Sequence, residues 1–186
     1  MTLPSDERER LLSLYRHRVD TYLDVDPEFG QRWRSWCRTL LSYGGLLVVA
    51  PAAPESDLER LLSSAVAFGP EARSIQADVG ECHRNVAELW IDGAIEAIGT
   101  GYALSADELW RQHSWGVDVG GVLVETTDER CAYMGIVLPA RAPSMQFAGS
   151  NAQEHLKTVL RQRGPRAAEL IGMIRELTSL GQARPT

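Results

Sequence analysis

The chain has 186 residues, of which 44% are hydrophobic and 24% charged, as in an ordinary globular protein. Its formal net charge of −6 argues against a nucleic-acid-binding protein, which normally presents a basic face, and against docking on anionic membranes. The most apolar run, residues 46–53, is much shorter than the roughly 20 residues of a membrane-spanning helix, and the polar stretch MTLPSDERER does not resemble a signal peptide.

The three cysteines, Cys37, Cys82 and Cys131, are widely spaced and form no CxxC pair. An odd number of separated cysteines argues against a disulfide framework and indicates a reducing compartment, so we expect a cytoplasmic protein with reduced thiols. Cys37 falls on the apolar side of a predicted helix and Cys131 at the start of a predicted strand, so we expect both of them in the core.

The amino-terminal part of the chain predicts three helices and one short buried strand. Hydrophobic residues at near-helical spacing predict helices over residues 5–24 and 27–42, with Ser5 as the cap of the first. The run LLVVA at 46–50 predicts a buried strand. Ser56 and the acid three residues after it form a capping-box pattern, which predicts a helix to about residue 68, followed by a loop over 69–81.

The rest of the chain begins with a predicted helix over residues 82–92 and then changes character. Stretches rich in β-branched and aromatic residues predict strands over 94–104, 112–119, 122–127 and 132–138, with a hairpin turn at Gly120 and Gly121. Residues 139–150 predict a loop. Ser150 and Gln153 form a second capping-box pattern, before helices over 151–163 and 166–180.

Helices followed by an antiparallel sheet and then by further helices predict an α+β fold rather than alternating β-α-β units. We expect a single domain over residues 1–186, with a core of approximately 70–138 in which the Cys82-bearing helix packs on the sheet. Residues 1–68 and 150–180 would add N-terminal and C-terminal helices to this core.

Cys82 stands at the start of its predicted helix, where the environment favours cysteine chemistry. A cysteine attacks carbonyl groups as the thiolate, and the pKa of a thiol falls at a helix N-terminus or beside an imidazolium. Backbone N–H groups of a first helical turn can also stabilise an oxyanion. The alternative interpretation is a buried structural cysteine, because cysteine is among the most buried residue types.

His113, on a predicted strand, is the candidate base for Cys82, and a third group should orient its imidazole. The predicted hairpin returns residues 122–128 beside it. A three-residue loop would place Glu125 on the His113 face, whereas a two-residue loop would favour Asp128. Both registers are compatible with the sequence.

Four short motifs follow one another in the order helix-start cysteine, Gly-Tyr-Ala, His-Ser-Trp, and an acid followed by threonine. They are Cys82-His83-Arg84-Asn85, Gly101-Tyr102-Ala103, His113-Ser114-Trp115 and Glu125-Thr126-Thr127, within residues 80–128. In this order and spacing the sequence resembles the transglutaminase-like branch of the papain-like cysteine protease and acyltransferase superfamily. Many bacterial members have Asp-Pro-Thr as the last motif, so the carboxylate of this chain is one methylene longer and the proline is replaced.

The resemblance implies a papain-like, transglutaminase-like fold and a triad of Cys82, His113 and Glu125 that acts on acyl groups. Asp128 is the alternative third residue, because the hairpin register is open. Gln76 lies six residues before Cys82, the offset at which papain-type peptidases carry an oxyanion-stabilising glutamine, although the rest of the papain signature is absent.

Residues close to these motifs are candidates for substrate binding, each with a structural alternative. His83 lies about 100° around the helix from Cys82, so it fits a supporting or substrate-side place. Asn85 either braces the site or occupies a plain helix surface, and a place in the sheet core is favoured for Trp115. The candidates are His83, Asn85, Tyr102, Trp110 and Trp115.

The sequence therefore predicts cysteine-dependent chemistry on an amide, ester or thioester, by a hydrolase (amidase or peptidase) or by an amide-forming acyltransferase. The substrate would be a small molecule, a peptide or a carrier-bound acyl group. No CxxC, HxxxH or HExxH pairing gives local metal-ligand spacing, so we expect no metal and no organic cofactor. The alternative is a non-catalytic papain-like domain that binds or scaffolds a protein partner, with Cys82 packed inside.

Overall fold

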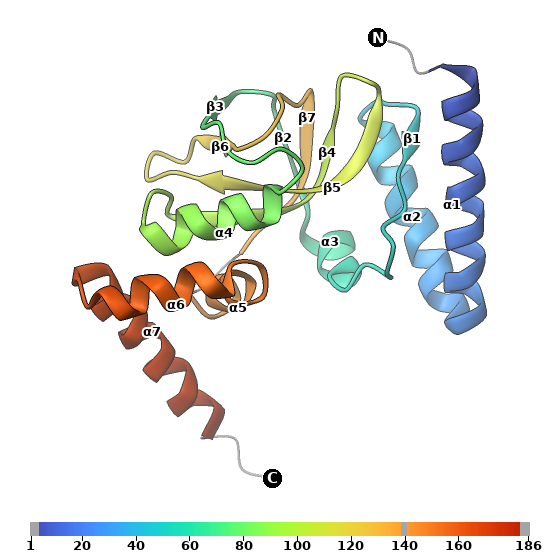
Figure 1. The fold of residues 1–186 in the computed structure, drawn as a ribbon. Coiled ribbons are helices and arrows are strands. Elements are labelled where there is room, and N and C mark those ends of the chain that lie inside the picture. Colours follow the sequence, from blue (N-terminus) through green and yellow to red (C-terminus); the bar gives the residue numbers. More distant parts are fainter. Residues whose placement is uncertain (1–3, 139–140, 183–186) are drawn as a thin grey trace. The chain divides into compact units, whose positions relative to one another are not determined.

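The structure, a computed structural model, describes residues 4–138 and 141–182 and combines helices with a mixed sheet (Figure 1). The α+β class predicted from the sequence is confirmed, whereas the expectation of a purely antiparallel sheet is wrong. The chain divides into two compact units. Unit 1 comprises the described residues of Met1–Pro70 with Thr100–His113 and Glu129–Ile136, and unit 2 comprises Glu71–Gly99 and Ser114–Asp128 with the described residues of Val137–Thr186.

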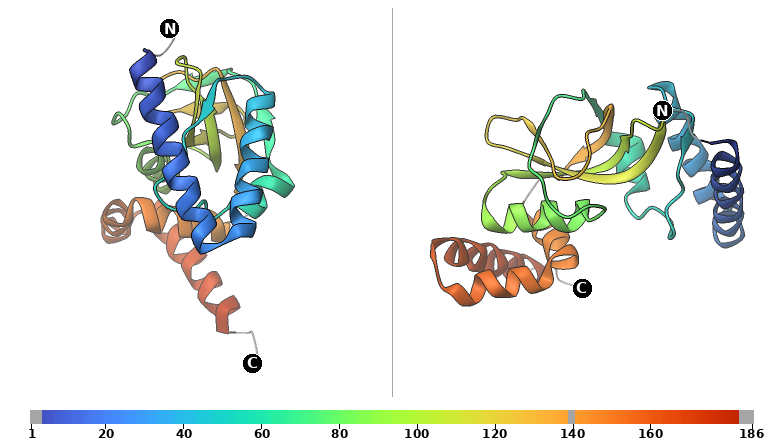
Figure 2. Two further views of the ribbon diagram at one scale, coloured as in Figure 1. Left: turned by 90° about the vertical axis from the view of Figure 1, so that its right-hand side faces the viewer. Right: turned by 45° about the horizontal axis from the view of Figure 1, so that its top comes forward.

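Two long helices open unit 1. α1 (Ser5–Val25) and α2 (Pro27–Ser42) lie side by side and antiparallel (Figures 1 and 2). Asp26 sets the start of α2, because its carboxylate accepts hydrogen bonds from the backbone N–H groups of Glu28 (2.9 Å) and Phe29 (3.1 Å), and Pro27 occupies the first helical position. The predicted bounds of both helices are confirmed to within a residue, but Pro4 rather than Ser5 is the cap residue of α1.

The sheet of unit 1 is built from short strands on two longer ones. β1 (Leu47–Val48) pairs in parallel with β5 (Leu109–Val117), and β2 (Val66–Phe68) pairs antiparallel with β7 (Ala132–Val137). β4 (Ala97–Leu104) lies between β7 and β5 in the hydrogen-bonded order. α3 (Leu58–Ser64) precedes β2 and packs against α2.

Aromatic side chains fill the core of unit 1. Trp33, Trp36, Tyr102 and Trp110 are each at most 1% exposed. The rings of Trp33 and Trp36 meet Tyr102 at centroid distances of 6.0 and 5.9 Å, and the Trp110 Nε1–H donates to the Gly44 carbonyl at 2.8 Å. This hydrogen bond satisfies the indole N–H inside the core.

Unit 2 joins a second part of the sheet to four helices. β3 (Ala72–Ser74) pairs in parallel with β6 (Leu123–Glu125), which pairs antiparallel with β5. Helix α4 (Cys82–Asp92) packs against α5 (Arg141–Asn151) and α6 (Gln153–Gln162), and α7 (Pro165–Gln182) packs against α5 and α6 (Figure 1). α4 ends at Gly93, whose φ of 76° is the left-handed conformation typical of a helix C-terminus.

Two element predictions between residues 56 and 81 are wrong. The helix expected over 56–68 is limited to α3, with Asp57 rather than Ser56 as its cap residue, because Ala65 leaves the helix in an extended conformation. Val66 and Phe68, which are β-branched and aromatic, pair with β7 instead. Part of the expected loop over 69–81 is the strand β3, which is held by its pairing with β6.

The loop predicted over 139–150 is largely the helix α5, and residues 139–140 lie outside the described part of the chain. Pro143 and Gly149 disfavour a helix locally, but burial of Met145 and Ala148 supplies tertiary packing that outweighs this propensity. Ser150 is inside α5 and the cap residue of α6 is Ala152, so the second predicted capping box is absent from this segment.

The structure places the two other cysteines differently. Cys37 is buried at 6% exposure, as predicted, whereas Cys131 is exposed, and its prediction as a core residue is wrong. Cys131 directly precedes β7, and its backbone N–H donates a hydrogen bond to Leu104 O at 2.7 Å. Its backbone therefore connects it to the sheet, while its side chain stays exposed. None of the helices within 4–138 and 141–182 has the length and apolar character that crossing a membrane requires.

A buried carboxyl group, Glu55, lies in unit 1. It is 7% exposed and accepts hydrogen bonds from Tyr102 Oη at 3.1 Å and Gln112 Nε2 at 2.9 Å. Burial raises the pKa of Glu55 above 4.5, against the opposing effect of these donors. The folded protein therefore holds the Glu55 proton more tightly than the unfolded chain does.

The raised pKa of Glu55 predicts a pH-dependent stability. The contribution of the protonated side chain is complete below about pH 4.5 and is lost as the pH rises through the raised pKa. We therefore expect the free energy of unfolding of Glu55→Gln, relative to the wild type, to increase between about pH 4 and about pH 8. Urea titrations at several pH values measure this difference, with the exposed Glu71→Gln as control. A difference that does not change with pH would contradict the assignment.

Close packing at Gly99 predicts a second effect on stability. A Cβ atom at this position would lie 2.1 Å from Nε1 of Trp115, which is fully buried, so Gly99→Ala should lower the free energy of unfolding by about 1–3 kcal/mol or more. At Gly172, in α7, a Cβ atom would meet open space. Gly172→Ala should instead stabilise the protein by up to about 1 kcal/mol. Equal effects of the two variants in denaturant titrations would refute the packing explanation.

Candidate functional site

The predicted site residues are distributed over the two units. Unit 1 contains His113, Tyr102 and Trp110. Unit 2 contains Cys82, Glu125, Gln76, Asp128, His83, Asn85 and Trp115.

Cys82 is the first residue of α4, as predicted, and is 8% exposed. The preceding residue, Glu81, is the cap residue and makes no side-chain capping bond, and the hydrogen bond from Asn85 N to Glu81 O (2.8 Å) begins the helical ladder. The sulfur therefore belongs to the first turn, where the helix dipole favours a negative charge. No disulfide is formed by any cysteine of the described residues.

Two side chains of α4 hold the loop that precedes Cys82. Asn85 Nδ2 donates to the carbonyl oxygen of Asp78 at 2.7 Å, and Arg84 Nη2 pairs with the Asp78 carboxylate at 2.5 Å. Asn85 is 4% exposed, so it braces this turn and does not occupy a plain helix surface. The loop and the first turn of α4 are fixed to each other by these bonds.

Glu125 carries a buried and firmly held carboxylate. It is 2% exposed, and its Oε1 accepts three hydrogen bonds: from Thr126 N (2.9 Å), from Thr127 N (2.8 Å) and from Thr127 Oγ1 (2.9 Å). Three donors on a single oxygen fix the side-chain conformation and stabilise its negative charge.

The register between β5 and β6 decides which face Glu125 shares. Gly116 lies opposite Val124, and the hydrogen bond from Asp118 N to Val122 O (3.0 Å) leaves residues 119–121 as a three-residue loop. This is the first of the two registers that the sequence permits. It puts Glu125 opposite residue 115, on the face of β5 that residues 115 and 117 share within unit 2.

Asp128 and Gln76 are both exposed. Asp128 follows the end of β6 by three residues and lies outside the strand pairing. The backbone around Gln76 is bound to the end of β6, because Ile75 N donates to Glu125 O at 2.8 Å and Ala77 N donates to Thr126 O at 3.3 Å. Gln76 is therefore on a segment adjacent to Glu125 that leads directly to Cys82.

His83 is bound to strand β5. Its Nδ1 lies 2.7 Å from the hydroxyl oxygen of Ser114, which is fully buried, and its ring packs edge-on against Phe147 at a centroid distance of 6.1 Å. Sequence reasoning assigned no role to Ser114, although it is the central residue of the His-Ser-Trp motif. A buried hydroxyl in a strand that needs a polar partner was the signal available.

The remaining predicted residues are buried. In unit 1, His113 is 3% exposed and its ring lies 6.2 Å from that of Tyr133, while Tyr102 and Trp110 belong to the aromatic core. In unit 2, Trp115 is fully buried beside Gly99, in the sheet core that the sequence favours for it.

Within the part of the chain that the structure describes, no three His, Cys, Asp or Glu side chains are grouped so that they could hold a metal ion. Comparisons with protein-family models, with curated proteins and with solved structures found no match.

The anchoring of Glu125 predicts opposite behaviour of two neighbouring threonines. Thr127→Val removes the Oγ1 donor from the carboxylate and should cost about 1.5–3 kcal/mol of stability. Thr126 is fully buried, and its Oγ1 has no hydrogen-bond partner among the described residues, so Thr126→Val should be neutral or stabilising. Denaturant titrations measure the free energy of unfolding of both variants. Thr127→Ser keeps the hydroxyl donor, so it should be much less destabilised than Thr127→Val. An equal cost of the two valine variants would argue against the anchor.

Proposed function

We propose that the chain is a cysteine-dependent acyl enzyme of papain-like, transglutaminase-like fold. Cys82 is the nucleophile, His113 is the base, and Glu125 orients the imidazole of His113. Glu125 is preferred to Asp128, because its carboxylate is buried and held by three donors, whereas Asp128 is exposed beyond the end of β6.

The observation that carries this proposal is the carboxylate of Glu125, which is 2% exposed and held by three donors on one oxygen. A catalytic imidazole needs such a group, because a buried carboxylate selects the tautomer of the base and stabilises the imidazolium that forms.

The first turn of α4 gives further support. The hydrogen bond between His83 and Ser114 ties this turn to β5, and these two residues directly follow Cys82 and His113 in the chain. His83 and Asn85 then serve as residues that position the turn, since each is engaged by a neighbouring element.

In the proposed reaction, His113 accepts the thiol proton and the Cys82 sulfur forms a bond to the carbonyl carbon of an amide, ester or thioester. The backbone N–H of Cys82 and the side chain of Gln76 stabilise the oxyanion. The bond to the leaving group breaks as His113 returns the proton to it. Water or an amine then attacks the thioester carbon while His113 takes a proton from it; the carbon–sulfur bond breaks, the acid or amide product leaves, and His113 returns the proton to the Cys82 sulfur. The acyl donor is a small molecule, a peptide or a carrier-bound acyl group.

This proposal predicts the order in which the cysteines react with an alkylating reagent. Cys131 is exposed and serves as an internal reference, and burial raises the pKa of the Cys37 thiol to about 11. With limiting iodoacetamide between about pH 5 and pH 8, we expect Cys82 to be labelled before Cys131 and Cys37 last. Peptide mass spectrometry of the native protein locates the adduct. Labelling of Cys131 before Cys82 at every pH would favour the non-catalytic scaffold.

The two histidines provide a matched pair for this experiment. His113→Ala should move the labelling of Cys82 to higher pH and lower acyl-adduct formation with an activated thioester by about a hundredfold or more. His83→Ala should largely retain both the pH dependence of Cys82 labelling and the rate of acyl-adduct formation. Its melting temperature is measured first, to show that the variant is folded. A larger effect of His83→Ala than of His113→Ala would show that the base is wrongly assigned.

A further inference from the structure

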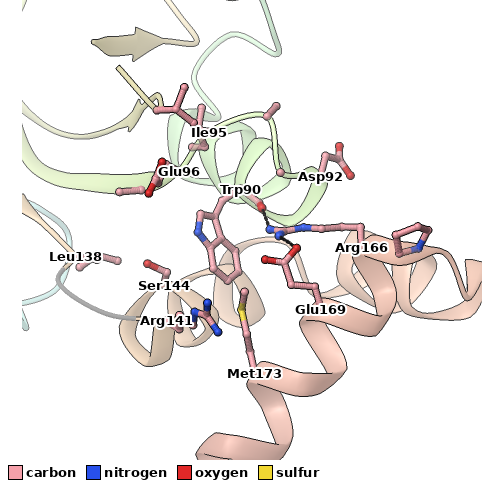
Figure 3. Close-up of a pocket in the computed structure, with 15 residues that line it drawn as sticks. Trp90, Asp92, Ile95, Glu96, Leu138, Arg141, Ser144, Arg166, Glu169 and Met173 are labelled. Atoms are coloured by element: carbon pink, nitrogen blue, oxygen red, sulfur yellow. Dashed lines mark hydrogen bonds and ion pairs between the residues drawn. The ribbon is translucent and has the colours of Figure 1, made fainter. Parts of the chain in front are cut away.

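A pocket of about 720 Å³ lies within unit 2, at the opposite end of α4 from Cys82 (Figure 3). An α-helix of this length spans about 15 Å, so the pocket is separate from the proposed nucleophile. The lining comes from the end of α4 and the approach to β4, and from the helices α5 and α7. Its volume is in the range of small-molecule sites.

The pocket has an apolar wall. The side chains of Trp90, Ile95, Leu138 and Met173 line it, and each is at most 7% exposed overall. An indole face and a thioether accept flat or branched apolar groups, and sulfur makes favourable contacts with aromatic rings. This wall indicates a ligand with a large apolar group.

Several charges around the pocket already have partners inside the protein. Arg166 Nε donates to Ile91 O at 2.7 Å, its Nη2 donates to Trp90 O, and its Nη1 pairs with Glu169 at 2.6 Å. These bonds satisfy carbonyl groups at the end of α4. Asp92 is similarly paired with His155 at 2.8 Å. These groups hold α4 against the last helices and are not available to a ligand.

Three polar side chains of the pocket remain for a ligand: Arg141, Ser144 and Glu96. Figure 3 shows Ser144 near Leu138, Arg141 next to Met173, and Glu96 across the pocket from them, with no hydrogen bond drawn to any of the three. Neither Arg141 nor Glu96 forms an ion pair with another described residue, although both line one pocket. Ser144 is 4% exposed, and its hydroxyl, which lines the pocket, makes no hydrogen bond within the described residues, so it can bind a polar group of a ligand.

We propose that this pocket binds a free amino acid with a large apolar side chain. The guanidinium of Arg141 and the hydroxyl of Ser144 bind the carboxylate, Glu96 binds the ammonium group, and the apolar side chain lies against Trp90 and Met173. One cation and one anion remain after the internal pairs are removed, so a zwitterion fits better than a simple acid, an amine or a doubly charged phosphate. The inference goes beyond the proposed acyl chemistry, because none of these residues takes part in it.

Isothermal titration of the full chain with phenylalanine, 3-phenylpropionate and phenethylamine tests the proposal. The two analogues lack the ammonium and the carboxylate group respectively, and we expect each to bind at least about tenfold more weakly than phenylalanine. Arg141→Gln should weaken phenylalanine by about tenfold or more. Glu96→Gln should weaken phenylalanine but leave 3-phenylpropionate unchanged.

Two variants serve as controls. Arg161→Gln removes a charge from the exposed surface of α6, outside the pocket, and should bind phenylalanine like the wild type. Cys82→Ala should also bind normally, which separates this site from the acyl chemistry. No saturable binding of phenylalanine at millimolar concentration, equal binding of 3-phenylpropionate, or full binding by Arg141→Gln would each overturn the proposal.

Discussion

The pairing register between β5 and β6 is the constraint that sets the surroundings of Glu125 in unit 2. Successive residues of a strand point to opposite faces, so a slip of one residue would exchange the whole set of side chains on each face. The three-residue loop over 119–121, closed by the backbone bond between Asp118 and Val122, prevents this slip. Glu125 consequently shares the face of residues 115 and 117, and its carboxylate is then held by the Thr126 and Thr127 donors that follow it.

The two ends of helix α4 differ in chemical character. Its first turn carries Cys82 and is tied to neighbouring segments through His83, Arg84 and Asn85. Its last turn offers backbone carbonyl groups to Arg166 and contributes Trp90 to the pocket. Because the dipole is positive at the first turn and negative at the last, a thiolate is favoured at one end and a guanidinium at the other.

Buried polar groups in both units are held by specific donors, which limits the conformations that the core can take. Glu55 in unit 1 accepts hydrogen bonds from the side chains of Tyr102 and Gln112. Glu125 in unit 2 accepts hydrogen bonds from backbone N–H groups and a hydroxyl group of the residues that follow it. Burial dominates at Glu55 and raises its pKa. The donors at Glu125 come from its own segment, so the anchor forms together with the end of β6.

Local signals in the sequence were sufficient for much of the helical structure. Asp26 and Pro27 define the start of α2, and Gly93 ends α4, because caps and turn residues act on the nearest few residues alone. The α+β class was predictable because the order of helical and strand-like segments is itself a pattern in the sequence, and the same periodicity indicated the helix that begins at Cys82. Three features were not predictable: the parallel pairing of β1 with β5 and of β3 with β6, the helix α5, and the exposure of Cys131. Each of them depends on packing between distant segments. The same is true of the contact between His83 and Ser114 and of the pocket beside Trp90: tertiary structure decides them, because hydrogen bonds and burial between residues far apart in the chain leave no periodic pattern in the sequence.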